Sequence, residues 1–199
     1  MNRNLFNVPF LALALMTSTT VLVRAVSPAL TDPPSTTSNA ALIERGAYLV
    51  EIMACHDCHT PWTMGPNGPE ADRSRALTGH PSDMPMPAPP ALPDGPWVWM
   101  GAGTNTAFAG PWGVSFTANL TPDKETGLGN WTYDMFIQTM KTRRHQGKGR
   151  PLLPPMPAQI IAAATEEDSR AIFAYLQSLK PVRNRVPAPI DPPDAGPAQ

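Results

Sequence analysis

Cysteine and charge are both scarce in this chain of 199 residues. It has two cysteines, Cys55 and Cys58, so these residues can form neither a network of disulfides nor a four-cysteine zinc site. Charged residues make up 16% of the chain and the formal net charge is −1, which implies neither nucleic acid nor an anionic membrane surface as a partner. Hydrophobic residues reach 42%, enough for the core of one domain with tails.

Both cysteines belong to one short motif, Cys55-His56-Asp57-Cys58-His59. This C-x-x-C-H pattern is that of covalent c-type haem attachment. Two thiols three positions apart lie on one turn of helix, where each can form a thioether with a haem vinyl group, and His59 then becomes the proximal iron ligand. The predicted cofactor is therefore one covalently attached haem c with its iron.

Two other chemistries use paired cysteines. A thioredoxin-like dithiol belongs to a strand–helix–strand context, whereas here the motif ends a helical, amphipathic stretch. A zinc site needs two further ligands, and the candidate donors His80 and His145 lack the paired spacing that structural zinc sites prefer. Haem attachment is favoured over both alternatives.

Apolar periodicity predicts helices from about residue 39 to the motif, at 133–143 after the N-cap Thr132, and after Thr165, which begins a capping box. Gly46 lies inside the first helix, where glycine costs about 1 kcal/mol against alanine. It is either simply tolerated, or it allows the last helix to cross closely.

Proline is abundant, with 26 residues, and predicts long irregular segments. Seven prolines crowd residues 81–96, which is too dense for a helix or a central strand. A short hairpin within 97–116 is the only strand structure that we expect. The proline-rich residues 182–199 are predicted to form an extended or disordered tail.

The N-terminal residues 1–25 read as a signal peptide, with Arg3, an apolar run and a small-residue cleavage pattern at 23–25. The alternative is an uncleaved membrane anchor over 5–23. Residues 26–38 are rich in Pro, Ser and Thr, which predicts a flexible linker. Either interpretation places the protein in the periplasm, as a free or tethered form.

A haem with one protein ligand has an open sixth position, which a methionine thioether can fill. Met156 is the leading candidate because prolines flank it and fix its loop, Pro154-Pro155-Met156-Pro157. A packing role for Met156 is the alternative. Other candidate ligands are His80, His145, Met84, Met86 and Met100, while Met53 and Met140 fit helical core stripes.

The residues around the motif and at the end of the chain resemble class I c-type cytochromes. The resemblance runs from about 39 to 179 and includes Arg45-Gly46, Tyr48-Leu49-Val50, the motif with Thr60, and Ala174-Tyr175-Leu176. It implies an all-α fold in which the N- and C-terminal helices cross at Gly46 and Tyr175, around a haem-centred core with long Pro-rich loops. The expected cytochrome c domain is 39–181, with the Pro-rich insert around 81–96.

Three segments sharpen the resemblance: Asn119-Leu120-Thr121-Pro122-Asp123, Thr126-Gly127-Leu128-Gly129-x-Trp131, and Pro154-Pro155-Met156-Pro157. They are similar to the cytochrome c domains that accompany bacterial periplasmic alcohol, aldehyde and sugar dehydrogenases. The likeness implies that Met156 is the distal ligand and that Trp131 lies near a haem propionate, with a core aromatic as the alternative for Trp131. Those proteins often carry three haem motifs, and this chain has one.

These features predict a carrier of single electrons rather than an enzyme. Its partners would be a dehydrogenase as donor and a respiratory acceptor, such as a terminal oxidase or another cytochrome. The alternative is a haem protein with a labile sixth ligand that acts as a catalyst or as a gas or redox sensor. The basic run at 143–150 is either solvated surface or a site for an acidic partner or a propionate.

Overall fold

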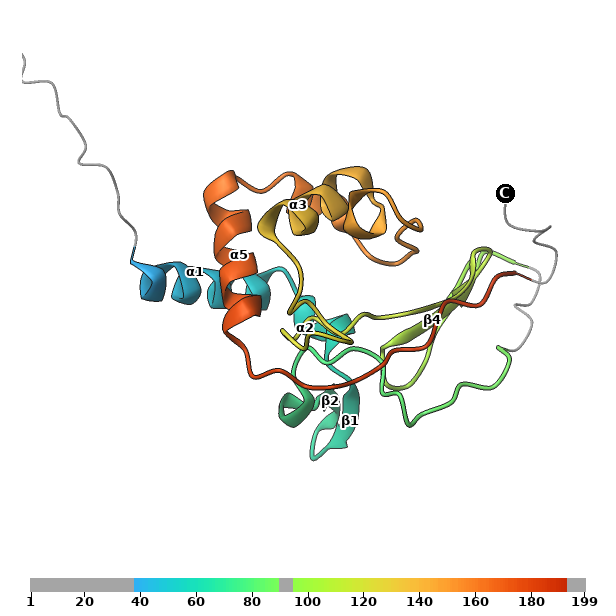
Figure 1. Cartoon of the computed structure of the whole chain (residues 1–199). Helices are drawn as coiled ribbons and strands as arrows, with labels where there is room; N and C mark the ends of the chain where they lie inside the picture. The colour runs from blue at the N-terminus through green and yellow to red at the C-terminus, as the bar shows by residue number, and fades with distance from the viewer. Residues whose placement is uncertain (1–37, 90–94, 193–199) are drawn as a thin grey trace, which may run out of the picture. The chain divides into compact units, whose positions relative to one another are not determined.

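The computed structural model describes residues 38–89 and 95–192 (Figure 1). The predicted signal or anchor at 1–25 and all but the last residue of the predicted linker lie outside the described residues, as do 90–94 of the insert and 193–199 of the tail. Within the described part, no helix combines the length and the apolar character that crossing a membrane requires.

Side-chain caps begin the three longer helices. In each case a Ser or Thr hydroxyl accepts a backbone N–H three residues further on, which satisfies one of the free donors of the first turn. The predicted caps Thr132 and Thr165 are confirmed, and Ser38 caps the first helix. The helices are α1 (Asn39–Ile52), α2 (Cys55–His59), α3 (Tyr133–Thr142), α4 (Ala158–Ala162) and α5 (Glu166–Ser178).

The all-α fold class predicted from the sequence is wrong, because the domain also contains two antiparallel sheets. Both sheets are built of strands of two to four residues, too short to show a reliable alternation of apolar and polar side chains. The expected hairpin within 97–116 is present, and a further strand extends it. In the first sheet, β1 (Trp62–Gly65) pairs with β2 (Gly68–Ala71). In the second sheet, β4 (Ala107–Gly110) lies between β3 (Met100–Gly101) and β5 (Gly113–Phe116).

Gly46 marks a close crossing of α1 and α5 (Figure 1). A Cβ atom at this position would collide with the carbonyl oxygen of Ala171 and would lie 2.7 Å from Cβ of Tyr175. Arg45 and Asp168 form an ion pair of 2.9 Å between the same two helices. The glycine is therefore needed for the contact and is not merely tolerated.

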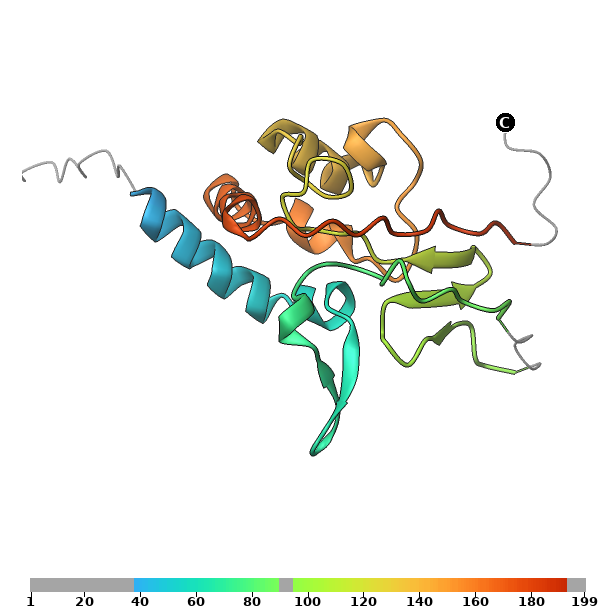
Figure 2. The same ribbon diagram turned by 60° about the horizontal axis from the view of Figure 1, so that its bottom comes forward.

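Residues 182–192 run extended along the domain and reach the three-stranded sheet (Figure 2). The backbones of Ile190 and Val114 exchange two hydrogen bonds of 2.8 and 2.9 Å, which covers the outer edge of β5. Asn184 is buried and its amide donates to the carbonyls of Thr78 and His80. These bonds hold the described part of the tail against the loop that follows the cysteine motif.

Candidate functional site

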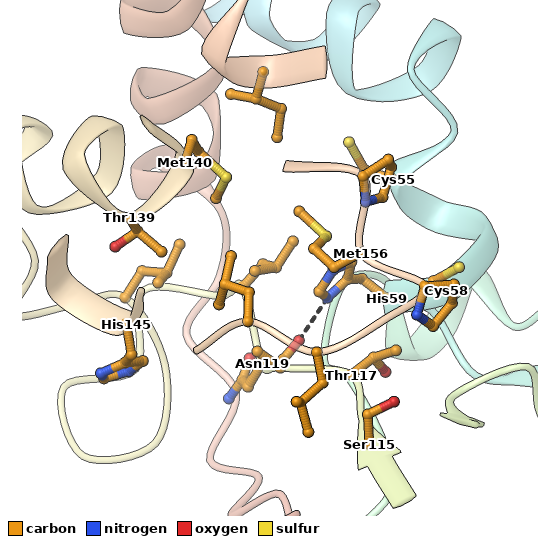
Figure 3. Close-up of a pocket in the computed structure, with 18 of the residues that line it drawn as sticks. Cys55, Cys58, His59, Ser115, Thr117, Asn119, Thr139, Met140, His145 and Met156 are labelled. Carbon is orange, nitrogen blue, oxygen red and sulfur yellow. Dashed lines mark hydrogen bonds between the residues drawn. The ribbon is translucent and has the colours of Figure 1, made fainter. Parts of the chain in front are cut away.

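A cavity of about 410 Å³ lies beside the cysteine motif, a volume in the range of ligand and cofactor pockets (Figure 3). Its wall combines α2, the inner faces of α3 and α5, the end of β5 with the loop after it, and the loop before α4. Most of the lining is apolar. The polar side chains labelled in Figure 3 are Cys55, Cys58, His59, Ser115, Thr117, Asn119, Thr139 and His145.

His59 is held in one orientation at the cavity wall. Its Nδ1 lies 2.8 Å from the carbonyl oxygen of Ala118, and because a carbonyl only accepts, Nδ1 carries the proton. The Nε2 lone pair is then free to bind a metal, as in sites where a second hydrogen bond fixes the tautomer of a ligating histidine. Burial lowers the pKa of His59, which keeps the ring neutral at physiological pH.

The two thiols of the motif are close but not bonded to each other. Burial raises the pKa of Cys55 to about 11, and burial followed by the charge of Asp57 also raises the pKa of Cys58. Cysteines that exchange disulfides have lowered pKa values instead, which disfavours the dithiol alternative. Among the described residues there is no group of three or more His, Cys, Asp or Glu side chains that could hold a metal ion.

Thr60 stabilises the turn that follows the motif, and the sequence motif alone did not identify it as a site residue. It is fully buried, and its hydroxyl accepts the backbone N–H of Leu77 at 2.9 Å. The same oxygen lies 2.8 Å from Nδ1 of the buried His56. These bonds tie the middle of the motif to the loop that leads to His80.

Met156 lies on a segment far from the motif in sequence and also lines the cavity (Figure 3). The Ser115 hydroxyl donates to the carbonyl of Pro154 at 2.7 Å, and the Leu152 N–H donates to the carbonyl of Arg143 at 2.8 Å. These bonds anchor the Met156 loop to β5 and to the end of α3.

Two further methionine side chains, Met53 and Met140, line the same cavity. Their helical periodicity indicated core positions, which is also where they lie, since both belong to or pack against the hydrophobic core. Periodicity cannot separate a core position from a cavity wall, because both face the interior. The candidates Met84, Met86 and Met100 are not among the residues that line this cavity.

Trp131 and His145 lie together at the cavity, with their rings edge to face and their centroids 5.1 Å apart. Burial and the nearby Arg150 lower the pKa of His145. Arg150 lines both this cavity and an adjoining one of about 490 Å³, which Arg185 also lines. Part of the basic run thus reaches the cavity rather than bulk solvent alone.

Thr117 supplies a polar atom that a bound group could use. Its Oγ1 is buried without a hydrogen-bond partner among the described residues, and the residue lines the cavity. Such an orphaned oxygen is costly unless a ligand or water satisfies it. Together, the two thiols, a neutral imidazole with a free Nε2, a thioether and a mostly apolar wall fit a covalently attached haem.

His80 is fully buried but lies away from this cavity, so it is not placed to reach an iron bound there. Its Nε2 donates to the carbonyl of Met84 at 3.0 Å, and its Nδ1 accepts from the hydroxyl of Thr106 at 2.9 Å. Both ring nitrogens are thus used to hold the start of the Pro-rich insert against the small sheet.

We expect His80 to make the fold less stable in mild acid. Burial lowers the pKa of His80 below its usual value of 6.5. Below about pH 6.5 the unfolded chain takes up a proton that the folded chain does not, so the free energy of unfolding falls as the pH falls. Urea unfolding at pH 7 and pH 5 measures how much free energy of unfolding is lost on acidification. This loss should be smaller for His80→Gln than for the wild type, by up to ~1.4 kcal/mol per pH unit. Equal losses in the two proteins would contradict this role.

Comparison with known proteins identifies relatives among bacterial dehydrogenases. The chain is 28% identical over 173 residues to a nicotinate dehydrogenase subunit of Pseudomonas putida, covering 87% of this chain and 12% of the relative. It is 29% identical over 140 residues to the gluconate 2-dehydrogenase cytochrome c subunit of Pantoea cypripedii, covering 69% and 23%. It is 29% identical over 179 residues to the fructose dehydrogenase cytochrome subunit of Gluconobacter japonicus, covering 87% and 29%. No family model matches the chain.

The gluconate 2-dehydrogenase and fructose dehydrogenase relatives are cytochrome subunits, which is the class that the resemblance of the motifs predicted. More narrowly, the chain is a homologue of the cytochrome c subunits of bacterial dehydrogenases. It spans less than a third of the length of the relatives named above, between 12% and 29%.

Proposed function

We propose that the protein is an extracytoplasmic c-type cytochrome with one haem, and that it carries single electrons without being an enzyme itself. Cys55 and Cys58 would hold the haem covalently, and His59 and Met156 would be the axial ligands. The single observation that carries this proposal is the His59 ring, fixed through Nδ1 to Ala118 with Nε2 free beside a largely apolar cavity. The thiols and the thioether on the walls of the same cavity support the other three roles.

When bound, the haem iron supplies the one-electron couple. The protein's own residues keep His59 neutral and oriented, exclude water with an apolar wall, and fix the Met156 loop through Ser115. A thioether ligand favours the reduced iron and so raises the reduction potential. With both axial positions filled from the protein, no coordination site is left for a substrate, which suits a carrier.

Trp131 would donate its indole N–H to a haem propionate, because that group is a donor only and Trp131 lies against His145 on the cavity wall. The positive charge of Arg150 and the unsatisfied hydroxyl of Thr117 would suit the same carboxylates.

A dehydrogenase is the proposed electron donor, and a respiratory protein such as a terminal oxidase or another cytochrome is the proposed acceptor. The dehydrogenase subunits among the homologues support the first assignment. A periplasmic location is proposed, in a form that is either released by signal cleavage or tethered by residues 1–25.

Covalent attachment is tested by the mass of the protein after acid denaturation. The wild type produced in a host that matures c-type cytochromes should keep one haem on the unfolded chain, and Cys58→Ser or Cys55→Ser should lose most or all of the attachment. The change is local because each cysteine sits at the cavity wall. A denatured wild-type chain that releases its haem would overturn the proposal.

A further inference from the structure

A long part of this chain bears no charge. From Gly95 to Pro122 the sequence has no Asp, Glu, Lys or Arg, and this segment contains the whole three-stranded sheet. Surface strands in soluble proteins usually carry charges that prevent unwanted contacts. A sheet without them is stable in water only if something covers its apolar groups or if its surface serves in recognition.

The apolar groups of this segment are strongly exposed at one place. The exposed fractions are 73% for Trp97, 57% for Val98 and 47% for Trp99. These residues lead directly into β3, the edge strand of the sheet, whose only strand partner in the described part of the chain is β4. Tryptophan is among the residues most enriched at the energetic centre of protein interfaces.

The exposed segment is connected to the cavity through one aromatic contact. The ring of Trp99 packs edge-on against Phe108 with centroids 5.7 Å apart, and Phe108 is buried and lines the cavity. A partner seated on Trp99 is thus separated from the cavity by two aromatic side chains. This short separation favours a redox partner over a lipid surface or a second copy of the chain, neither of which needs it.

We propose that Trp97, Val98 and Trp99, together with the edge of β3 that pairs with no strand among the described residues, form the surface on which an uncharged, apolar face of a dehydrogenase subunit docks. This inference rests on the proposed electron-carrier function and identifies the surface that serves it. A surface without charges gains nothing from opposite charges on its partner, so its interface depends on apolar burial and its affinity depends little on salt.

The test uses the full haem-bearing chain, produced with an affinity tag in its own host and purified through that tag. Two quantities are measured: the dehydrogenase activity that co-purifies with the chain, and the rate at which that dehydrogenase reduces the haem. We expect Trp97→Ser/Val98→Ser to lower both at least about tenfold, as loss of an aromatic anchor does. Reduction by ascorbate should be unchanged. Both replaced side chains are more than half exposed, so the core and the Trp99–Phe108 contact are left intact.

A matched control is Ile52→Ser, which removes from α1 an apolar side chain as exposed as Val98 (57%), outside the uncharged segment. It should behave as the wild type.

A second variant, Val98→Asp, keeps both tryptophans and places a charge within the surface. It should weaken binding of the partner as strongly as the double variant does. Raising sodium chloride from about 50 to 500 mM should change the wild-type rate by less than about twofold if no charge pair is involved.

The results separate this inference from the function on which it rests. If the dehydrogenase binds the double variant and reduces its haem as it does the wild type, the assignment of the docking surface is wrong and the carrier function stands. If the wild type retains no dehydrogenase, the dehydrogenase assignment and the surface both fall. A variant that loses only binding to phosphatidylcholine vesicles, or only self-association in sedimentation, would show that lipid or a second copy is the occupant and would overturn the proposal.

Discussion

Replacing Met156 by leucine should open the sixth coordination position of the iron. Leucine keeps the volume of the side chain and removes the sulfur, so the loop that Ser115 anchors should stay in place. We expect the reduced protein to bind carbon monoxide, and its reduction potential to fall by roughly 0.1 V or more, a fraction of the range that axial ligands cover. A redox titration and the reduced spectrum under the gas measure both effects.

Met140→Leu is the matched control, because Met140 also lines the cavity and lies in the core. It should leave the spectrum and the potential close to those of the wild type. If Met140→Leu opens the iron and Met156→Leu does not, the assignment of Met156 is wrong and Met140 is the ligand. If neither variant binds the gas, the sixth ligand is neither of these two methionines, and Met53, which lines the same cavity, must be considered.

Replacing Gly46 by alanine should produce a large loss of stability. The added Cβ would collide with the backbone oxygen of Ala171, which cannot move without separating α1 from α5. We expect a loss of about 3 kcal/mol in the free energy of unfolding, the upper end of overpacking costs. For a domain of this size that corresponds to a fall in Tm of roughly 6–12 °C in the holoprotein.

Gly103→Ala provides the comparison. No atom lies within 4 Å of the Cβ that would be added there, and the backbone has no left-handed φ. That variant should unfold within about 0.5 kcal/mol of the wild type. A Gly46→Ala protein as stable as Gly103→Ala would show that the two terminal helices are not packed as closely as described.

The parts of the structure that sequence reasoning predicted are those specified locally. The caps at Thr132 and Thr165 need only a hydroxyl and a free N–H three residues later, and both are present. The crossing at Gly46 was predictable because a glycine inside a helix is costly without a reason. The homologues bear out the class of protein that the motif and its neighbouring segments indicated.

The strands were not predictable in the same way. A strand such as Gly68–Ala71 has the sequence GPEA, whose residues have low strand propensity, so the tight turn that pairs it with β1 creates it. The buried roles of Thr117 and Asn184 also depend on segments far apart in the chain. Such contacts leave no local pattern in the sequence, so the residues of the cavity wall could not be predicted from it.

The most direct test of the central claim is the optical spectrum of the reduced holoprotein, recorded with and without carbon monoxide. We expect a low-spin spectrum that does not change with the gas, because the proposed ligands His59 and Met156 would occupy both axial positions. Ready binding of carbon monoxide by the wild type would contradict it. The sixth position would then be open or labile, and a catalytic or sensing haem protein would replace the electron carrier.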